Sequence, residues 1–108
     1  MALSMIQFSY KQETVEKLIN NPEDRSIAVR KLIEKLGGKL LAFYYTYGKY
    51  DGFLIVDMPD QTSGLAADMA AVAAGGTAKL KTTILITVEE AMAAMKKAQG
   101  LKLEQPKG

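Results

Sequence analysis

The chain contains no cysteine and no histidine among its 108 residues. Without cysteine there is no disulfide framework, no thiolate nucleophile and no zinc ribbon. Without histidine there is no imidazole base, no histidine metal ligand and no histidine-ligated haem. We therefore expect neither a metal nor a cofactor, and acid–base chemistry would have to come from carboxylates and phenols.

An excess of charge of one sign is also missing. The 14 lysine and arginine residues stand against 12 aspartate and glutamate residues, for a net charge of +2. Nucleic-acid binding usually needs a larger basic excess. No apolar run reaches the ~18 residues that span a membrane, and the start MALSMIQFSY lacks the pattern of a signal peptide. We therefore expect a cytoplasmic protein that binds neither nucleic acid nor membrane.

What is present is typical of one globular domain, with 48% hydrophobic and 24% charged residues. The periodicity of the apolar residues predicts an alternation of strands and helices. In chain order we expect a strand over 3–10, a short helical piece over 13–20, a helix over 22–36, strands over 39–47 and 50–58, a helix over 62–74, a strand over 79–87, and a helix after Thr87. Residues 1–98 would form the domain and 99–108 a flexible tail. This order predicts an α+β, ferredoxin-like βαββαβ fold with an extra C-terminal helix and a four-stranded antiparallel sheet.

Several residues mark where the helices begin and end. Asn21 is a candidate cap for the first long helix, with Pro22 at its first position. Gly37 follows the last turn, where a left-handed residue is expected, and Gly38 allows a free turn into the next strand. The last helix begins with a Thr-x-x-Glu capping box that starts at Thr87.

The two central strands read as a hairpin. Glycine at the first position of the Gly48-Lys49 loop is typical of a type II′ turn, and a two-residue loop sets the register. Gly52 would leave space for a tyrosine ring to lie across the strand. The expected pairs are Tyr45 with Gly52, Phe43 with Leu54, Leu41 with Val56, and Tyr44 with Phe53.

Both faces of this hairpin are apolar. Helices would cover only one face of the sheet, so the other face should be polar if it meets water. One face would carry Leu41, Phe43, Tyr45, Leu54 and Val56, and the other Leu40, Ala42, Tyr44, Phe53 and Ile55. We therefore expect a homodimer or higher oligomer in which two sheets pack face to face, as a dimeric α/β barrel. The alternative is that the last helix and the tail cover the second face within one chain.

An ordered set of motifs resembles the GYD domain family over about residues 4–95. The motifs are Leu36-Gly37-Gly38-Lys39-Leu40, Phe43-Tyr44-Tyr45-Thr46, Gly48-Lys49-Tyr50-Asp51 and Pro59-Asp60. This resemblance implies a small bacterial domain without an established biochemical function. It further implies the dimeric α/β-barrel superfamily, which includes cofactor-free monooxygenases, haem enzymes, isomerases and ligand-sensing modules. Activity carried from fold alone is an analogy.

The tyrosine-rich hairpin is the strongest candidate for chemistry. Asp51 in a pocket with Tyr45 is a candidate general base with a phenol beside it. The structural alternative is that Asp51 accepts backbone hydrogen bonds beside the turn while Gly48 supplies a positive φ. Arg25 is the second signal, because a cation in the first turn of a helix opposes the helix dipole. An anionic ligand would offset this cost, and so would an ion pair with Glu23, Asp24 or Asp51.

A ligand cleft is expected between the helices and the sheet, lined by Phe8, Tyr45, Tyr50 and Met69. The helix over 62–74 would pack through an apolar face made of Leu65, Met69, Val72 and Ala73. Three functions stay open at this point. The first is a small-molecule-binding homo-oligomeric module, the second a cofactor-independent oxygenase or isomerase using Asp51 and Tyr45, and the third a purely architectural oligomer.

Overall fold

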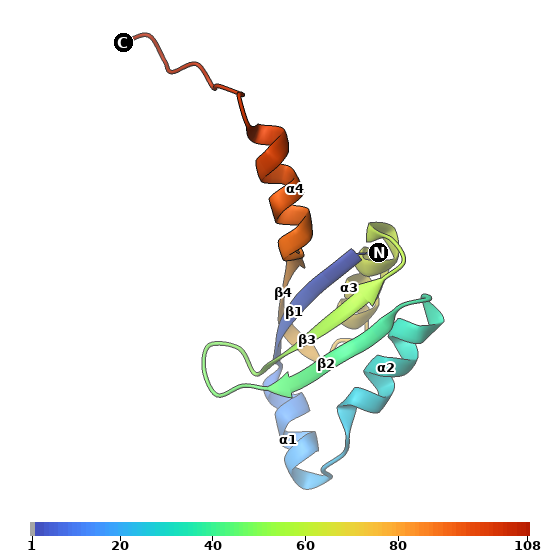
Figure 1. Ribbon diagram of the computed structural model, residues 1–108. Coiled ribbons are helices and arrows are strands. Elements are labelled where there is room, and N and C mark those ends of the chain that lie inside the picture. Colours follow the sequence, from blue (N-terminus) through green and yellow to red (C-terminus); the bar gives the residue numbers. More distant parts are fainter. Residues whose placement is uncertain (1) are drawn as a thin grey trace.

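The computed structural model describes residues 2–108 and contains one four-stranded sheet with four helices. The elements are β1 (Ala2–Tyr10), α1 (Gln12–Asn20), α2 (Arg25–Lys35), β2 (Lys39–Tyr45), β3 (Gly52–Met58), α3 (Gln61–Ala73), β4 (Thr77–Leu85) and α4 (Val88–Ala98). The strands lie in the order β2-β3-β1-β4, and all neighbours are antiparallel (Figure 1). The predicted ferredoxin-like α+β fold with an extra C-terminal helix is confirmed.

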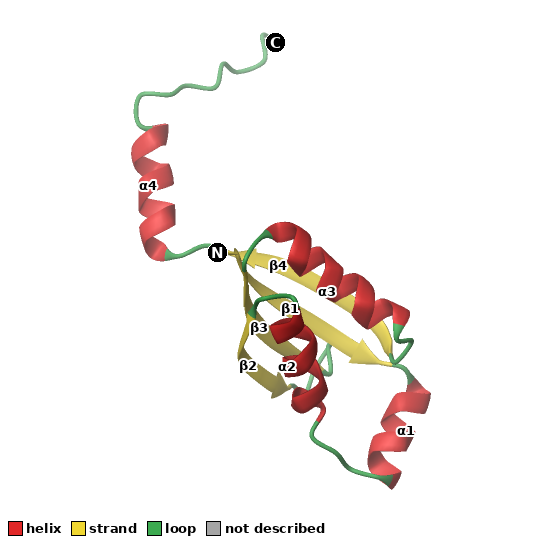
Figure 2. Ribbon diagram, turned by 90° about the vertical axis from the view of Figure 1, so that its right-hand side faces the viewer, coloured by secondary structure: helices red, strands yellow, loops and turns green. Residues whose placement is uncertain are grey.

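The core lies between the sheet and two helices on one of its faces. Helices α2 and α3 lie side by side over this face (Figure 2). Every second residue of β1 and β3 points toward them, as the alternating burial of both strands shows. The buried apolar residues are Ile6, Phe8, Ile33, Leu40, Leu54, Val56, Met58 and Ala67. This alternation is why the strands could be predicted from the sequence.

Helix α2 begins three residues later than predicted. Asp24, and not Asn21, is the N-cap, and its carboxylate accepts a hydrogen bond from the backbone N–H of Ser26 at 2.9 Å. The cap at Asp24 leaves Asn21 and Pro22 in the link between α1 and α2. The other end of α2 agrees with the prediction, because Gly37 has a φ of +82° and terminates the helix.

The hairpin loop differs from the predicted two-residue turn. Gly48 does not adopt a positive φ, so it supplies no type II′ geometry. The Thr46 N–H instead donates to the Asp51 carbonyl oxygen at 2.8 Å, which leaves residues 47–50 as a longer loop. The physical reason is competition from β1, since the Asp51 N–H donates to the Phe8 carbonyl oxygen at 2.8 Å.

The register of β2 against β3 agrees with the prediction near the loop and departs from it further away. Tyr45 faces Gly52, and Phe43 faces Leu54, as expected. A bulge between Leu40 and Ala42 then brings Leu40, and not Leu41, opposite Val56. Leu40 is consequently buried in the core, whereas Leu41 is 54% exposed. Leu40 therefore takes the place opposite Val56 that was predicted for Leu41.

Helix α3 packs through a different face from the one predicted. Leu65, Met69 and Val72 are 60%, 63% and 61% exposed, whereas Ala67 is buried. Small residues on the sheet side let this helix approach the strands closely, and the larger apolar side chains point outward. The prediction that Leu65, Met69 and Val72 form the packed stripe was therefore wrong within a single chain.

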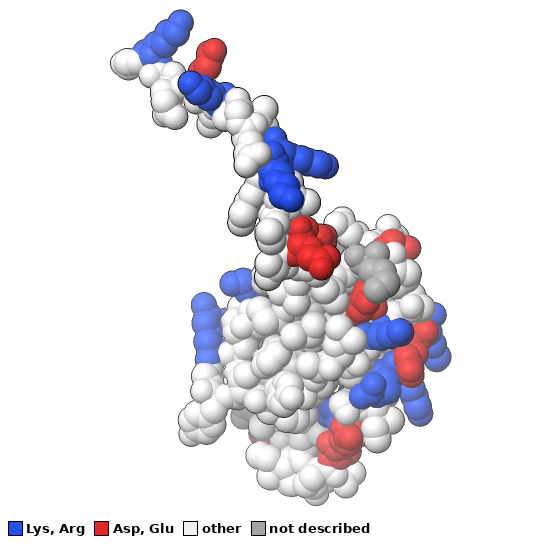
Figure 3. Space-filling view, in the orientation of Figure 1, with Lys and Arg blue, Asp and Glu red and all other residues white. Residues whose placement is uncertain are grey.

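The second face of the sheet is open, and within residues 2–108 no helix lies over it (Figures 1 and 2). Its apolar residues alternate with the buried ones along the strands, and they are Leu3, Met5, Ala42, Tyr44, Phe53, Ile55 and Leu85. Figure 3 shows an uncharged area over the strands, with charged side chains toward its rim.

Helix α4 projects away from the body and contains no buried residue (Figure 1). Its predicted capping box is present, because the side chain of Thr87 accepts from the Glu90 N–H at 3.1 Å and Glu90 accepts from the Thr87 N–H. The radius of gyration is 17.9 Å, against ~13 Å for a compact chain of about 100 residues. The alternative that α4 and the tail cover the open face within one chain was therefore wrong.

Candidate functional site

A cavity of about 210 Å³ lies between the sheet and the two helices that cover it. Residues of all four strands form its floor, and helices α2 and α3 form its sides. The lining includes Ile6, Phe8, Tyr10, Thr14, Arg25, Ala28, Val29, Leu32, Ile33, Phe43, Leu54, Ala67, Asp68, Ala70, Ala71, Ala74, Gly76, Thr77 and Leu80. Most of these side chains are apolar, so the cavity favours an apolar ligand body.

The space exists because, apart from Asp68, α3 contributes only alanine side chains to it. Ala67, Ala70, Ala71 and Ala74 replace the larger residues that would otherwise fill the gap between α2 and α3. At one part of the lining, α1 is hydrogen-bonded to the residue that precedes β4. There, the Thr14 hydroxyl donates to the carbonyl oxygen of Gly76 at 2.9 Å.

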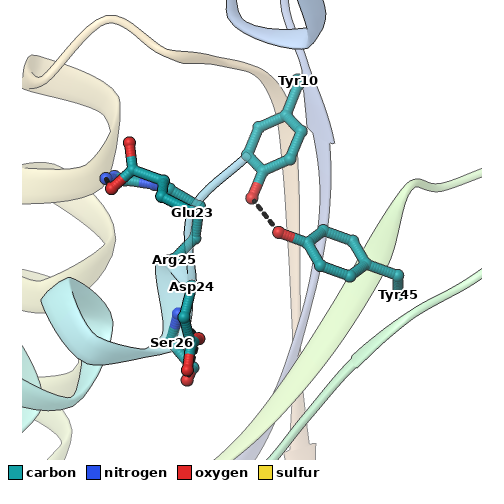
Figure 4. Close-up of polar contacts among 6 residues, drawn as sticks. All are labelled: Tyr10, Glu23, Asp24, Arg25, Ser26 and Tyr45. Atoms are coloured by element: carbon teal, nitrogen blue, oxygen red, sulfur yellow. Dashed lines mark hydrogen bonds and ion pairs between the residues drawn. The ribbon is translucent and has the colours of Figure 1, made fainter. Parts of the chain in front are cut away.

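Arg25 brings a positive charge to the cavity. It is the first residue of α2, which the Asp24 cap positions, and its side chain is 38% exposed. Hydrogen bonds from Ser26 lower the pKa of the Asp24 carboxyl, so the cap is ionised at neutral pH. The Arg25 guanidinium lies 3.6 Å from the Glu23 carboxylate, which realises one of the ion pairs considered from the sequence (Figure 4).

Asp68 brings a negative charge to the same cavity, and sequence reasoning missed it. Its Oδ2 accepts a hydrogen bond from the Thr82 hydroxyl at 2.7 Å. Its Oδ1 is buried, and no group within residues 2–108 donates to it. Its spacing in the sequence could have identified it. Asp68 comes four residues after Gly64 and directly after Ala67, which places it on the side of α3 that carries small residues.

Two phenols meet where β1 and β2 end. The hydroxyls of Tyr10 and Tyr45 lie 3.2 Å apart, pointing toward each other (Figure 4). Burial, the hydrogen bond to Tyr45 and the proximity of that second phenol together raise the pKa of Tyr10. Tyr10 lines the cavity. Tyr45 lines a separate groove of about 410 Å³ beside the start of α2, which Arg25 also reaches.

Asp51 lies outside the cavity lining and is held by the backbone. Its Oδ2 accepts a hydrogen bond from the Tyr10 N–H at 2.8 Å, and its own N–H donates to Phe8. The carboxylate thereby adds a hydrogen bond to Tyr10, the last residue of β1, from the residue just before the start of β3. This arrangement is the backbone-binding role considered from the sequence, although Gly48 plays no part in it.

The remaining candidate residues occupy different places. Of the four residues expected to line the cleft, Phe8 lies in the cavity wall, whereas Tyr45, Tyr50 and Met69 do not. The Lys49 ammonium lies 6.0 Å from the centre of the Tyr50 ring. The ring that lies against Gly52 belongs to Phe8 rather than to Tyr45. Gly38 is tightly enclosed, because an added Cβ would lie 2.5 Å from the Met58 sulfur.

Within residues 2–108, no three acidic side chains converge in a way that could hold a metal ion. None of the helices in this range is long and apolar enough to cross a membrane.

Solved structures share this fold at low sequence identity. MtbAldR aligns with a TM-score of 0.59 and 16% identity over 80% of this chain and 53% of its own, so the chain spans about half the length of MtbAldR. TTHA0845 from Thermus thermophilus aligns with a TM-score of 0.55 and 15% identity, covering 82% of this chain and 96% of its own. Protein Atu4242 from Agrobacterium tumefaciens aligns with a TM-score of 0.51 and 13% identity over 82% and 94%. At these identities the likeness concerns the fold alone.

Sequence comparison is more specific. No curated protein matches the chain. The GYD domain family, however, matches residues 5–95, which span most of β1, all of β2 to β4, helices α1 to α3 and most of α4. The resemblance inferred from the glycine and tyrosine motifs is thereby confirmed, and the chain is a member of the GYD domain family.

Proposed function

We propose that this protein is a cytoplasmic, homo-oligomeric module that binds a small molecule in the cavity between α2, α3 and the sheet. The observation that carries the proposal is the cavity itself, with its apolar walls and the Arg25 guanidinium at its edge. An apolar enclosure with a few polar groups is the usual form of a ligand site.

The size of the cavity limits the ligand. Its volume of about 210 Å³ is below the ~300 Å³ of most ligand sites. It exceeds the ~150 Å³ of an apolar cavity that binds benzene. We therefore expect a ligand with a single ring or an aliphatic body of similar size. Arg25 favours a ligand with one anionic group, which would compete with the exposed Glu23 carboxylate.

The open face supports assembly of two copies. Its apolar residues would remain in water in a single chain, and burying them contributes ~25 cal/mol per Å². Because the open face and the cavity lie on opposite sides of the sheet, two sheets can pack together without closing either cavity. A dimer of this kind would carry two complete ligand sites, one for each chain.

Ligand binding is tested first by native mass spectrometry of freshly purified protein, followed by denaturation to release any bound molecule. A reproducible extra mass on the oligomer supports the proposal and identifies the ligand. Ala71→Leu places a larger side chain in the cavity wall and should abolish the extra mass. Ala73→Leu, on the same helix but outside the lining, is the matched control. Retention of the ligand by Ala71→Leu would place the bound molecule elsewhere.

Assembly is tested by sedimentation of variants at fixed protein concentration. Ile55→Lys puts a charge in the centre of the open face, opposite Met5 and Ala42. It should convert the oligomer into a folded monomer, because a lysine buried between two sheets would lack a partner. Val72→Lys introduces the same charge at an exposed position of α3 and should leave assembly intact. A wild-type protein that sediments as a monomer would overturn the sheet-to-sheet proposal.

The alternative, a cofactor-independent oxygenase or isomerase using Asp51 and Tyr45, has less support. A general base must reach its substrate at hydrogen-bond distance. Asp51 accepts from the Tyr10 backbone and does not line the cavity. Turnover lost in a stably folded Asp51→Asn variant would favour the enzyme over the binding module.

A further inference from the structure

The carboxylate of Asp68 is only half satisfied. It projects from α3 beside the buried Ala67 and lines the cavity. The Thr82 hydroxyl donates to one oxygen, and the other oxygen is buried without a donor from residues 2–108. The ion pair found in this range joins Arg25 to Glu23, so Asp68 has no cationic partner there. A buried acceptor without a donor is costly for a folded protein.

Three other aspartates of the chain show what a structural carboxylate does here. Asp24 and Asp60 cap helices by accepting from the N–H groups of Ser26 and Ser63. Asp51 accepts from the N–H of Tyr10. Each of them satisfies a backbone group that would otherwise lack a partner. Asp68 has no such backbone donor, so its position in the cavity wall calls for a different explanation.

We infer that Asp68 is the polar anchor of the cavity and accepts a hydrogen bond from a hydroxyl or amino group of the ligand. This inference rests on the proposed function and narrows its ligand class. The ligand would be a small ring that carries an anionic group for Arg25 and a hydrogen-bond donor for Asp68. A phenolic or amino-substituted ring acid has this chemistry.

Asp68 lines the cavity, but its Oδ1 is buried, so a ligand donor reaches this oxygen only when the carboxylate turns toward the cavity. The torsion about the Cβ–Cγ bond of aspartate is broad, and rotation about it supplies this movement. Thr82 lies on β4, where it pairs with Ile6 of β1, and its hydroxyl donates to Asp68. The sheet therefore orients Asp68 as a positioned acceptor.

Binding of ring acids that differ by one group tests the anchor. The probes are 3- and 4-hydroxybenzoate against 3- and 4-fluorobenzoate, which have nearly the same shape but lack the donor. Isothermal titration should give tighter binding of at least one hydroxyl compound by about 10- to 100-fold, the range of a hydrogen bond to a charged group. Asp68→Leu should erase this preference and Asp68→Asn should reduce it. Asp57→Leu, which changes an aspartate outside the cavity lining, is the control.

The melting temperature of the ligand-free protein supplies a second readout. Replacing Asp68 should raise it if Asp68 is a ligand anchor and lower it if Asp68 has a structural role. Removing a carboxylate whose buried Oδ1 has no donor should raise the melting temperature of Asp68→Leu by about 4–8 °C. Thr82→Val should lower it, because the carboxylate then loses its remaining donor. A lower melting temperature for both Asp68→Leu and Asp68→Asn would identify Asp68 as structural and overturn the inference.

The binding outcomes separate the two proposals. If wild-type protein binds the fluoro and hydroxyl compounds equally well, the Asp68 anchor is wrong and the binding module stands. If it binds none of the four, the proposed ligand class is wrong, and with it the inference about Asp68.

Discussion

Replacing Gly52 with alanine should destabilise the protein more than its single added methyl group would lead one to expect. The new Cβ would lie 2.4 Å from the Cζ atom of Phe8 and 2.7 Å from the backbone oxygen of Tyr44. Phe8 is 3% exposed, and its ring contacts the rings of Tyr10 and Phe43 at centroid distances of 5.1 and 5.5 Å. It therefore has little room to move aside.

The magnitude follows from this enclosure. Overpacking a core typically costs about 1–3 kcal/mol. Here one of the two clashes is with a backbone oxygen in the β2–β3 pairing, which cannot rotate away. We therefore expect Gly52→Ala to lower the free energy of unfolding by about 3 kcal/mol, the upper end of that range. Equilibrium urea unfolding at fixed protein concentration, followed by circular dichroism, measures this change.

Gly48 provides the matched control in the same hairpin. It has no atom within 4 Å of an added Cβ and no positive φ. Gly48→Ala should leave stability unchanged or raise it by up to about 1 kcal/mol, because alanine restricts the unfolded chain. Gly52→Ala within about 0.5 kcal/mol of wild type, the scatter of ordinary surface substitutions, would refute the packing argument. Strong destabilisation by Gly48→Ala would instead support the two-residue turn predicted from the sequence.

Three further predictions concern hydrogen bonds and titration. Asp51→Ala should cost about 1–3 kcal/mol in urea unfolding, because it leaves the Tyr10 N–H without its acceptor, whereas Asp51→Asn keeps an acceptor and should cost less. The pKa of Tyr10 is raised above its ordinary 10.0, so folding favours the neutral phenol. This stabilisation is full below pH 10 and is lost as the pH rises further; Tyr10→Phe should therefore show a shallower fall in melting temperature between pH 9 and pH 11. Thr87→Ala should speed amide hydrogen exchange in α4, at a helix cost of about 0.5–2 kcal/mol, and leave the urea midpoint unchanged because α4 buries no residue.

The sequence by itself determined the elements and their order. Alternation of apolar residues at Ile6, Phe8 and Tyr10 identifies β1 because side chains in a strand point to opposite faces. Gly37 and the Thr87–Glu90 box mark helix ends because they satisfy backbone groups locally. That the chain contains no histidine and no cysteine is likewise known from the sequence alone. These features depend on near neighbours in the chain, so no tertiary contact is needed to recognise them.

Only the tertiary structure decided which side chains share the cavity and how the hairpin closes. The bulge in β2 places Leu40, instead of the predicted Leu41, opposite Val56. The Asp51 N–H bonds to Phe8 of β1, so the hairpin does not close in the predicted two-residue turn. The small face of α3 brought Asp68 to Thr82, fourteen residues away in the chain. In each case, groups distant in the sequence supply the hydrogen bonds or the close packing that fix the local conformation. A local sequence pattern does not show which distant groups will lie beside it, so it cannot predict these contacts.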